Sequence, residues 1–396
     1  MAGNLSGTVL GIERLVGPEQ ERVSRRQVGL LAHPASVDHD FVHALDLLLR
    51  AGARVERLFG PEHGFMGEAQ DMEAVERRSV HPSGIPLKSL YGADAATLAP
   101  SADDLAGLDA LIVDLQDVGA RYYTFVWTAL LALRACREAG IEMVVTDRPN
   151  PIGGQRVEGA PQSDGYLSFV GLKPVAVRHG MTVGELLTMV AADEGLSAHL
   201  TVVKMTGWRR DRLITEIDAP WVMPSPNMPT PDTATVYPGM CLIEGTEVSE
   251  GRGTTRPFEL VGAPGIDGIR LAARLDSCGL PGVFFRPVSF KPGFQKHKNR
   301  TCDGVQLHVR DPRIFLPYRT GVALLLALRM EAGDAFAWRH APYEFVANIP
   351  AVDLLTGSDA VRTLVDQGAA LDDIAATWED GEKGFAAARR EYLLYP

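Results

Sequence analysis

The sequence lacks the patterns of several large classes of protein. Its 396 residues include only four cysteines, Cys136, Cys241, Cys278 and Cys302, and no two of them form a CxxC pair. Neither a disulfide framework nor a zinc knuckle is therefore indicated. No apolar run approaches the ~18 residues that a membrane-spanning helix requires. The hydrophobic share of 46% is nevertheless ample for the core of a globular protein.

Positive charge is also scarce. The chain carries 39 basic and 50 acidic side chains, which gives a net charge of −11, and it has no basic cluster. Nucleic acid binding requires Lys and Arg gathered on one face, so nucleic acid is excluded as the main partner. The first residues contain neither the charged nor the apolar region of an export signal, and we therefore expect a cytoplasmic protein.

Common catalytic motifs are missing as well. The chain has no GxGxxG, no GxxxxGK[ST], no GxSxG and no HExxH. We therefore expect no dinucleotide, no metal and no other cofactor. His39 and His43 stand four residues apart in a predicted helix over 39–51 and could hold a metal ion. An exposed helix face is the simpler interpretation of this pair.

The first 150 residues alternate between apolar strands and helices. Strands are predicted over 27–32, 54–59, 110–115 and 141–146, and helices over 39–51 and 123–139. Continuous apolar strands separated by helices are typical of a parallel sheet covered on both faces. The sequence therefore predicts an α/β fold with a doubly wound, Rossmann-like sheet.

The second half of the chain is organised differently. A helix is predicted over 181–194, with Thr182 and Glu185 at the spacing of a capping box. Residues 224–268 are dense in glycine and proline, and α/β patterning resumes after residue 265. We predict a catalytic domain over 1–265, a smaller C-terminal α/β domain over 266–396, and a site in the cleft between them.

Polar residues lie at or just after the ends of three of the predicted strands. They are Glu62 and His63, then Asp114, Gln116 and Asp117, and finally Asp147, Arg148 and Asn150. In doubly wound sheets, ligands bind beyond the carboxyl ends of the strands, so these residues are candidates for a site. Asp114 lies between apolar neighbours and needs a partner. Arg121 could pair with it or bind an anionic group of a substrate.

The glycine- and proline-rich part contains two further candidate segments. Residues 244–259 hold four glutamates and two arginines among glycines, a composition too polar for a core, and we interpret them as a wall of the site. Pro224-Ser-Pro-Asn-Met-Pro-Thr-Pro231 resembles a rigid polyproline segment that could present Asn227 to a ligand. A purely structural crossover is the alternative for this segment.

Motifs in these segments resemble those of one known family along nearly the whole chain. The matching segments are Phe59-Gly-Pro-Glu-His-Gly-Phe65, Ser89-Leu-Tyr-Gly92, Asp114-Leu-Gln-Asp-Val-Gly-Ala-Arg-Tyr-Tyr-Thr124, Asp147-Arg-Pro-Asn-Pro151, Arg178-His-Gly-Met-Thr182, Pro224-Ser-Pro-Asn-Met-Pro-Thr230 and Glu244-Gly-Thr with Gly251-Arg-Gly-Thr254. The chain is similar to the NamZ-type exo-β-N-acetylmuramidases, glycoside hydrolase family 171. This resemblance implies a Rossmann-like domain with a smaller C-terminal domain. It also implies release of N-acetylmuramic acid from the non-reducing end of peptidoglycan fragments.

The resemblance also suggests roles for individual residues. Glu62 matches the proposed catalytic glutamate and is expected to be the general acid, with His63 tuning it. The partner carboxylate is Glu250, Glu244 or Asp117. An arginine, Arg121 or Arg252, is expected to bind the lactyl carboxylate of muramic acid. The remaining contacts to the sugar are predicted at Asp114, Gln116, Asn150, His179 and Asn227. The expected partner is a small sugar substrate, and a homo-oligomeric state is left open.

Two other functions compete with this prediction. One is a metal-assisted hydrolase built from His63, Asp114, Asp117 and His179. The other is a non-catalytic protein that binds cell-wall sugars or muropeptides.

Overall fold

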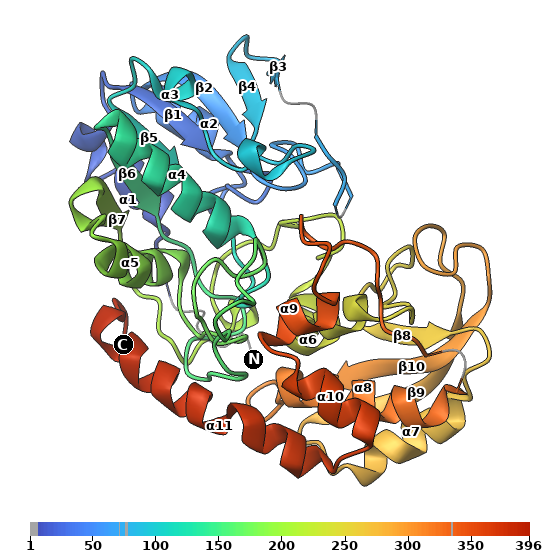
Figure 1. The fold of residues 1–396 in the computed structure, drawn as a ribbon. Coiled ribbons are helices and arrows are strands. Elements are labelled where there is room, and N and C mark those ends of the chain that lie inside the picture. The colour runs from blue at the N-terminus through green and yellow to red at the C-terminus, as the bar shows by residue number, and fades with distance from the viewer. Residues whose placement is uncertain (1–6, 71, 76–77, 334–335) are drawn as a thin grey trace.

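The larger half of the molecule is built on a seven-stranded sheet (Figure 1). The computed structural model describes residues 7–70, 72–75, 78–333 and 336–396. The strands lie in the order β3-β4-β2-β1-β5-β6-β7, and β3 is antiparallel to β4 while all other neighbours are parallel. Their bounds are β1 Gln27–Leu31, β2 Arg54–Gly60, β3 Arg78–Val80, β4 Pro86–Ser89, β5 Ala110–Val113, β6 Glu142–Thr146 and β7 Leu200–Val203.

Helices cover both faces of this sheet. In β5, Leu111 and Val113 join one apolar core with α4 and α5, whereas Ala110 and Ile112 join a second core with α1 and α2. Alternate residues of a strand point to opposite faces, so this buried strand needs apolar residues throughout. The helices are α1 Gly11–Val16, α2 Ala44–Arg50, α3 Ala102–Leu105, α4 Phe125–Ala139 and α5 Val183–Glu194. The predicted doubly wound α/β fold is confirmed.

Helix α2 is shorter than the sequence predicts. Phe41 has a φ of 60°, which is incompatible with an α-helix, and the helix begins only at Ala44. Nδ1 of His43 accepts the backbone N–H of Leu45 at 3.2 Å and so caps the helix. The prediction that His39 and His43 share a helix face is therefore wrong. The capping box of Thr182 and Glu185 at the start of α5 is confirmed.

The smaller half contains a three-stranded antiparallel sheet in the order β8-β10-β9. Its strands are β8 Leu260–Ala263, β9 Val283–Phe290 and β10 Cys302–Val309, and its helices are α6 Pro231–Met240, α7 Gly268–Ser277, α8 Pro317–Glu331, α9 Ala351–Thr356, α10 Ala360–Gln367 and α11 Leu371–Ala388. Helices α6 and α8 touch backbone to backbone. A Cβ on Gly239 would lie 1.8 Å from the Pro317 carbonyl oxygen, and one on Gly321 would lie 2.2 Å from the Gly239 carbonyl oxygen.

Two elements of the smaller half precede the predicted boundary at residue 265. Strand β8 pairs with β10, and α6 packs on α8. The division into 1–265 and 266–396 stays a prediction, and these contacts favour an earlier boundary, near residue 231.

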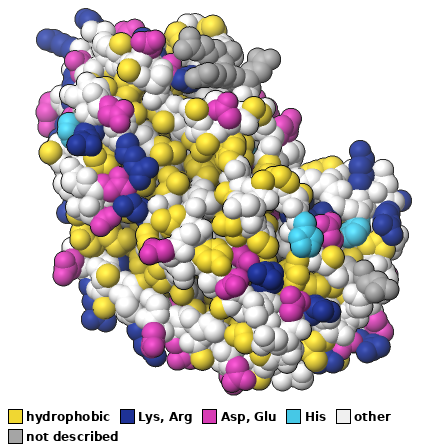
Figure 2. Space-filling view, viewed as in Figure 1, with side chains coloured by type: hydrophobic (Ala, Val, Ile, Leu, Met, Phe, Trp, Pro, Cys, Tyr) yellow, Lys and Arg dark blue, Asp and Glu magenta, His cyan; other side chains and the backbone are white. Residues whose placement is uncertain are grey.

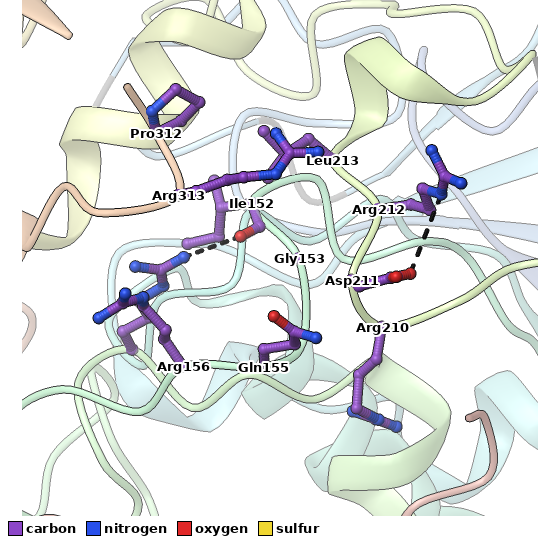
Figure 3. A pocket seen from close by; sticks show the side chains of 11 residues that line it. Ile152, Gly153, Gln155, Arg156, Arg210, Asp211, Arg212, Leu213, Pro312 and Arg313 are labelled. Carbon is purple, nitrogen blue, oxygen red and sulfur yellow. Dashed lines mark hydrogen bonds and ion pairs between the residues drawn. The ribbon is translucent and has the colours of Figure 1, made fainter. Parts of the chain in front are cut away.

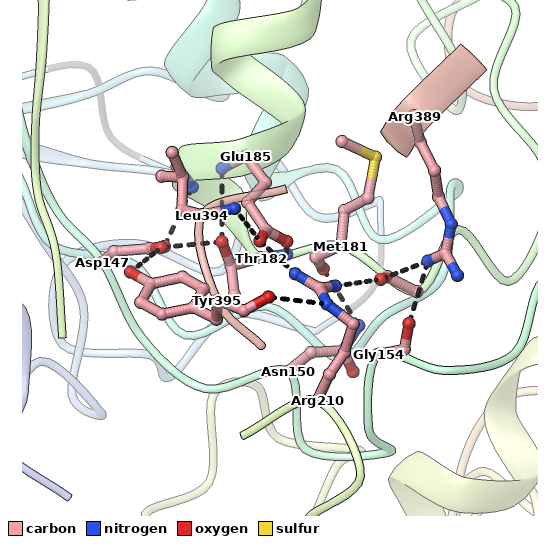
Figure 4. Close-up of polar contacts among 12 residues, drawn as sticks. Asp147, Asn150, Gly154, Met181, Thr182, Glu185, Arg210, Arg389, Leu394 and Tyr395 are labelled. Atoms are coloured by element: carbon pink, nitrogen blue, oxygen red, sulfur yellow. Dashed lines mark hydrogen bonds and ion pairs between the residues drawn. The ribbon is translucent and has the colours of Figure 1, made fainter. Parts of the chain in front are cut away.

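The chain returns to the larger half at its C-terminal end. Helix α11 runs along both halves (Figure 1). Beyond it, the Tyr395 hydroxyl donates to Oδ2 of Asp147 at 2.6 Å, and Arg210 donates its Nε–H to the Tyr395 carbonyl at 3.2 Å (Figure 4). These contacts fix the last residues to the loops that follow β6 and β7. None of the helices in the described part of the chain is long and apolar enough to span a membrane.

Candidate active site

Glu62 stands in a tight turn directly after β2. A Cβ on Gly60 would lie 2.3 Å from the Phe65 backbone nitrogen, so only glycine fits where the strand ends. His63 has a φ of 70°, which turns the chain back at once. The Glu62 side chain is buried at 6% exposure, and its Oε2 accepts the hydroxyl of Thr124 at 2.6 Å. The turn thus aims a buried carboxyl group at the start of α4.

Glu62 lines a narrow pocket between the two halves, with a cavity volume of about 30 Å³. The face seen in Figure 2 is hollowed between the halves, and apolar side chains are numerous along that hollow. Aromatic side chains from both halves form much of the pocket wall. They are Tyr122, Tyr123, Phe125, Tyr237, Phe258 and Tyr343. Of the residues predicted for the site, five line this pocket: Glu62, His63, Asn227, Glu244 and Arg252.

Two further carboxylates face the same pocket. Oε1 of Glu244 accepts from Arg252 at 2.6 Å, and its Oε2 accepts the Tyr343 hydroxyl at 2.7 Å. Glu344 accepts the Tyr91 hydroxyl at 3.0 Å and has a φ of 45°, a left-handed conformation. Sequence reasoning missed Glu344, because no recognisable motif surrounds it and only the fold brings it to Tyr91.

Glu250 lies outside the lining of this pocket. Its carboxylate is 2.8 Å from Lys296 Nζ and 3.4 Å from Arg252 Nε. Burial raises the pKa of Glu250, but attraction to Lys296 and Arg252 outweighs burial and leaves the pKa below its ordinary value. Glu250 is therefore placed to hold Arg252 rather than to touch a substrate.

The predicted pairing of Asp114 with Arg121 is wrong. Asp114 is fully buried and accepts from Arg148 Nε at 2.5 Å and from the Thr146 hydroxyl at 2.6 Å. The Arg121 guanidinium, also fully buried, donates to the carbonyls of Ala160, Val175 and Leu355 at 2.5 to 2.8 Å. Burial lowers the pKa of Arg121 to about 10. Both side chains connect segments of the fold and lie outside the pocket lining.

Four other predicted residues also lie outside the pocket lining. Gln116 donates to the carbonyls of Asp117 and Pro149 at 2.8 and 3.0 Å, and Asn150 donates to the Met181 carbonyl at 2.9 Å. Oδ2 of Asp117 accepts the Gly119 N–H at 2.5 Å and lies 3.6 Å from His179 Nε2. The sequence correctly indicated polar strand ends, but most of these side chains stabilise the loops that follow the strands.

Asn227 reaches the pocket because its segment is anchored elsewhere. His33 follows β1 and hydrogen-bonds through Nδ1 to the Pro224 carbonyl at 3.2 Å, while its Nε2 accepts the Gln116 N–H at 2.9 Å. Burial, with the charge of Arg148, lowers the pKa of His33 to about 3, so the ring stays neutral. The proline-rich segment is therefore tied to the sheet, and Asn227 donates to Gln70 at 3.0 Å.

The donors proposed for a metal do not converge. Within the described ranges, no group of three or more His, Cys, Asp or Glu residues could hold a metal ion. Asp114 is occupied by Arg148, and His63 Nδ1 lies 3.0 Å from the Ala69 carbonyl oxygen.

Comparison with known proteins identifies the family. Residues 28–232 match the N-terminal part, and residues 235–395 the C-terminal part, of the family described as exo-beta-N-acetylmuramidase NamZ. The chain belongs to the NamZ family. The predicted family is thus confirmed, and with it the predicted class of glycoside hydrolase.

Individual relatives agree with this assignment. The chain is 39% identical to a Bacillus subtilis (strain 168) protein named peptidoglycan beta-N-acetylmuramidase NamZ, over 97% of this chain and 91% of that protein. Two crystal structures of DUF1343 family proteins from Bacteroides fragilis NCTC 9343 also match. Their TM-scores are 0.88 and 0.76, and their sequence identities are 32% and 29%. Each match covers 98% of this chain and 99% of the other. The NamZ fold therefore extends over both halves described above.

Proposed function

We propose that this chain is an exo-acting glycoside hydrolase that releases N-acetylmuramic acid from the non-reducing end of peptidoglycan fragments. The observation that supports it most is the placement of Glu62 and Glu244 on one narrow pocket between the halves. Hydrolysis of a glycosidic bond generally uses two carboxyl groups that flank it.

Glu62 is the proposed proton donor. The hydrogen bond from Thr124 fixes Oε2 and thereby orients the carboxyl group. The other oxygen would deliver the proton to the leaving oxygen of the glycosidic bond as that bond breaks. Because little solvent reaches this buried carboxyl group, the proton would pass to the substrate rather than to bulk water.

Glu244 is the proposed partner carboxylate. Both of its oxygens accept hydrogen bonds, from Arg252 and Tyr343, and these donors stabilise a negative charge at this position. A fixed carboxylate there would stabilise the positive charge that develops on the sugar or would activate a water molecule. Arg252 is the proposed contact for the lactyl carboxylate, since Arg121, the other candidate, is enclosed by backbone carbonyls.

The test compares two chromogenic substrates, p-nitrophenyl β-N-acetylmuramide and p-nitrophenyl β-N-acetylglucosaminide. They differ only by the lactyl ether, so faster release from the muramide is expected if the pocket recognises that group. Release from neither substrate would overturn the proposal. Binding of a muramyl disaccharide without turnover would instead indicate the competing function of a muropeptide-binding protein. The cytoplasmic location stays a prediction, and the oligomeric state stays open.

A further inference from the structure

A second pocket, larger than the one at Glu62, lies elsewhere in the molecule. It has a cavity volume of about 400 Å³ and shares no lining residue with the Glu62 pocket. Five arginines line it, and we call it the arginine pocket: Arg156, Arg178, Arg210, Arg212 and Arg313. The first four belong to the larger half and Arg313 to the smaller one. Figure 3 shows Arg156, Arg212 and Arg313 on different sides of the loop at Gly153.

Two of these arginines are held as fixed charges. Arg178 donates to Glu158 at 2.9 Å and to the Ile152 carbonyl at 2.8 Å, and Arg210 is ion-paired with Glu185. Arg210 also donates to the Gly180 carbonyl at 3.0 Å (Figure 4). Side chains held this firmly lose little further conformational entropy when a ligand binds.

The pocket keeps an excess of positive charge. The carboxylates paired with its arginines are Asp211, Glu158, Glu185 and Glu216, four against five. Arg156 is exposed and makes no ion pair with a carboxylate of the described residues. Within the described residues, the buried Nε–H of Arg178 makes no hydrogen bond, and that of Arg212 has only the Asp211 carboxylate, 3.9 Å away. Unsatisfied buried donors are costly, so a ligand that accepts from them is favoured.

We propose that the arginine pocket is a second binding site, for a phosphate monoester or inorganic phosphate. Guanidinium groups donate pairs of hydrogen bonds to phosphate oxygens. A tetrahedral anion presents oxygens in several directions, which suits arginines that come from separate loops better than a planar carboxylate does. The volume exceeds that of one phosphate group and leaves room for an attached sugar. This site goes beyond the proposed hydrolase function and does not depend on it.

Calorimetry on the full chain tests the proposal without any hydrolysis. Inorganic phosphate, glucosamine 6-phosphate, glucosamine and acetate are titrated at equal ionic strength into three proteins. They are the unchanged chain, the double variant Arg156→Ala/Arg212→Ala and the control Arg50→Ala/Arg54→Ala. The control removes the same charge from exposed positions in α2 and β2. A thermal melt of each protein verifies folding.

We expect one phosphate-dependent site per chain, with an affinity that falls about tenfold or more in the double variant and stays unchanged in the control. Tighter binding of glucosamine 6-phosphate than of phosphate would identify a sugar phosphate as the ligand, and equal binding would identify phosphate itself. The absence of phosphate binding, equal binding of acetate, or equal weakening in the control variant would overturn the proposal.

Discussion

The hydroxyl of Thr124 donates a 2.6 Å hydrogen bond to Oε2 of Glu62. Glu62 lies just beyond the end of β2, and Thr124 immediately precedes α4. Because both elements belong to the packed larger half, the bond fixes the carboxyl group before a substrate arrives.

Replacing Glu62 by Gln should remove the proton donor while keeping the shape of the side chain. We expect kcat on a disaccharide of N-acetylmuramic acid and N-acetylglucosamine to fall by about 10²–10⁴-fold, the usual contribution of general acid catalysis, because the leaving sugar needs this proton. The melting temperature should change little. Glu68→Gln, at an exposed carboxylate in the following loop, is the matched control and should retain activity. Near-normal turnover by Glu62→Gln would rule out the assigned role.

Thr124 is expected to act by positioning Glu62. Thr124→Val removes the donor but keeps the volume, so kcat should fall by roughly tenfold with KM little changed. Thr124→Ser restores the hydroxyl and should recover most of the activity. If the Ser variant is as slow as the Val variant, the methyl group rather than the hydrogen bond is what matters at this position.

Lys296 should matter for stability through its contact with Glu250. Its Nζ donates to Glu250 at 2.8 Å and to the carbonyls of Ile243 and Val248 at 3.1 Å each. Lys296→Met leaves Glu250 buried with one fewer partner and should lower the free energy of unfolding by about 3 kcal/mol. Adding Glu250→Gln should recover part of this loss. Lys298→Met, at an exposed neighbour, is the control, and equal effects of both lysine variants in urea denaturation would contradict the prediction.

Asp147 should make stability depend on pH. Burial raises its pKa from 3.8 to about 6, against the hydrogen bonds from Tyr395 and Thr182. The folded state therefore holds the proton more tightly than the unfolded state, and this contribution to stability is lost as the pH rises from about 4 to about 6. Relative to Asp147→Asn, the unchanged chain should lose on the order of 2 kcal/mol across this range. If the curves of unfolding free energy against pH are parallel for the two proteins, Asp147 does not cause this pH dependence.

The sheet and Glu62 could be predicted because local sequence determines them. A strand buried on both faces requires a continuous apolar run, and the Gly-Pro-Glu-His turn follows one such run directly. Arg121 was misjudged because its partners are carbonyls as far away as Leu355. Glu344 was missed because Tyr91, its partner, lies 253 residues away. Contacts between residues so far apart along the chain produce no periodic pattern in the sequence.

The contact between Gly239 and Gly321 has a consequence for the active site. Helix α6 continues directly into the 3₁₀ turn Cys241–Gly245 that carries Glu244. The position of Glu244 is therefore set by direct contact between the backbones of α6 and α8. No side chain lies between them that could adjust its conformation. A methyl group added at Gly239 would push α6 away from α8 and would shift Glu244 relative to the opposite side of the pocket. Gly239 and Gly321 together therefore determine the width of the pocket between the two halves.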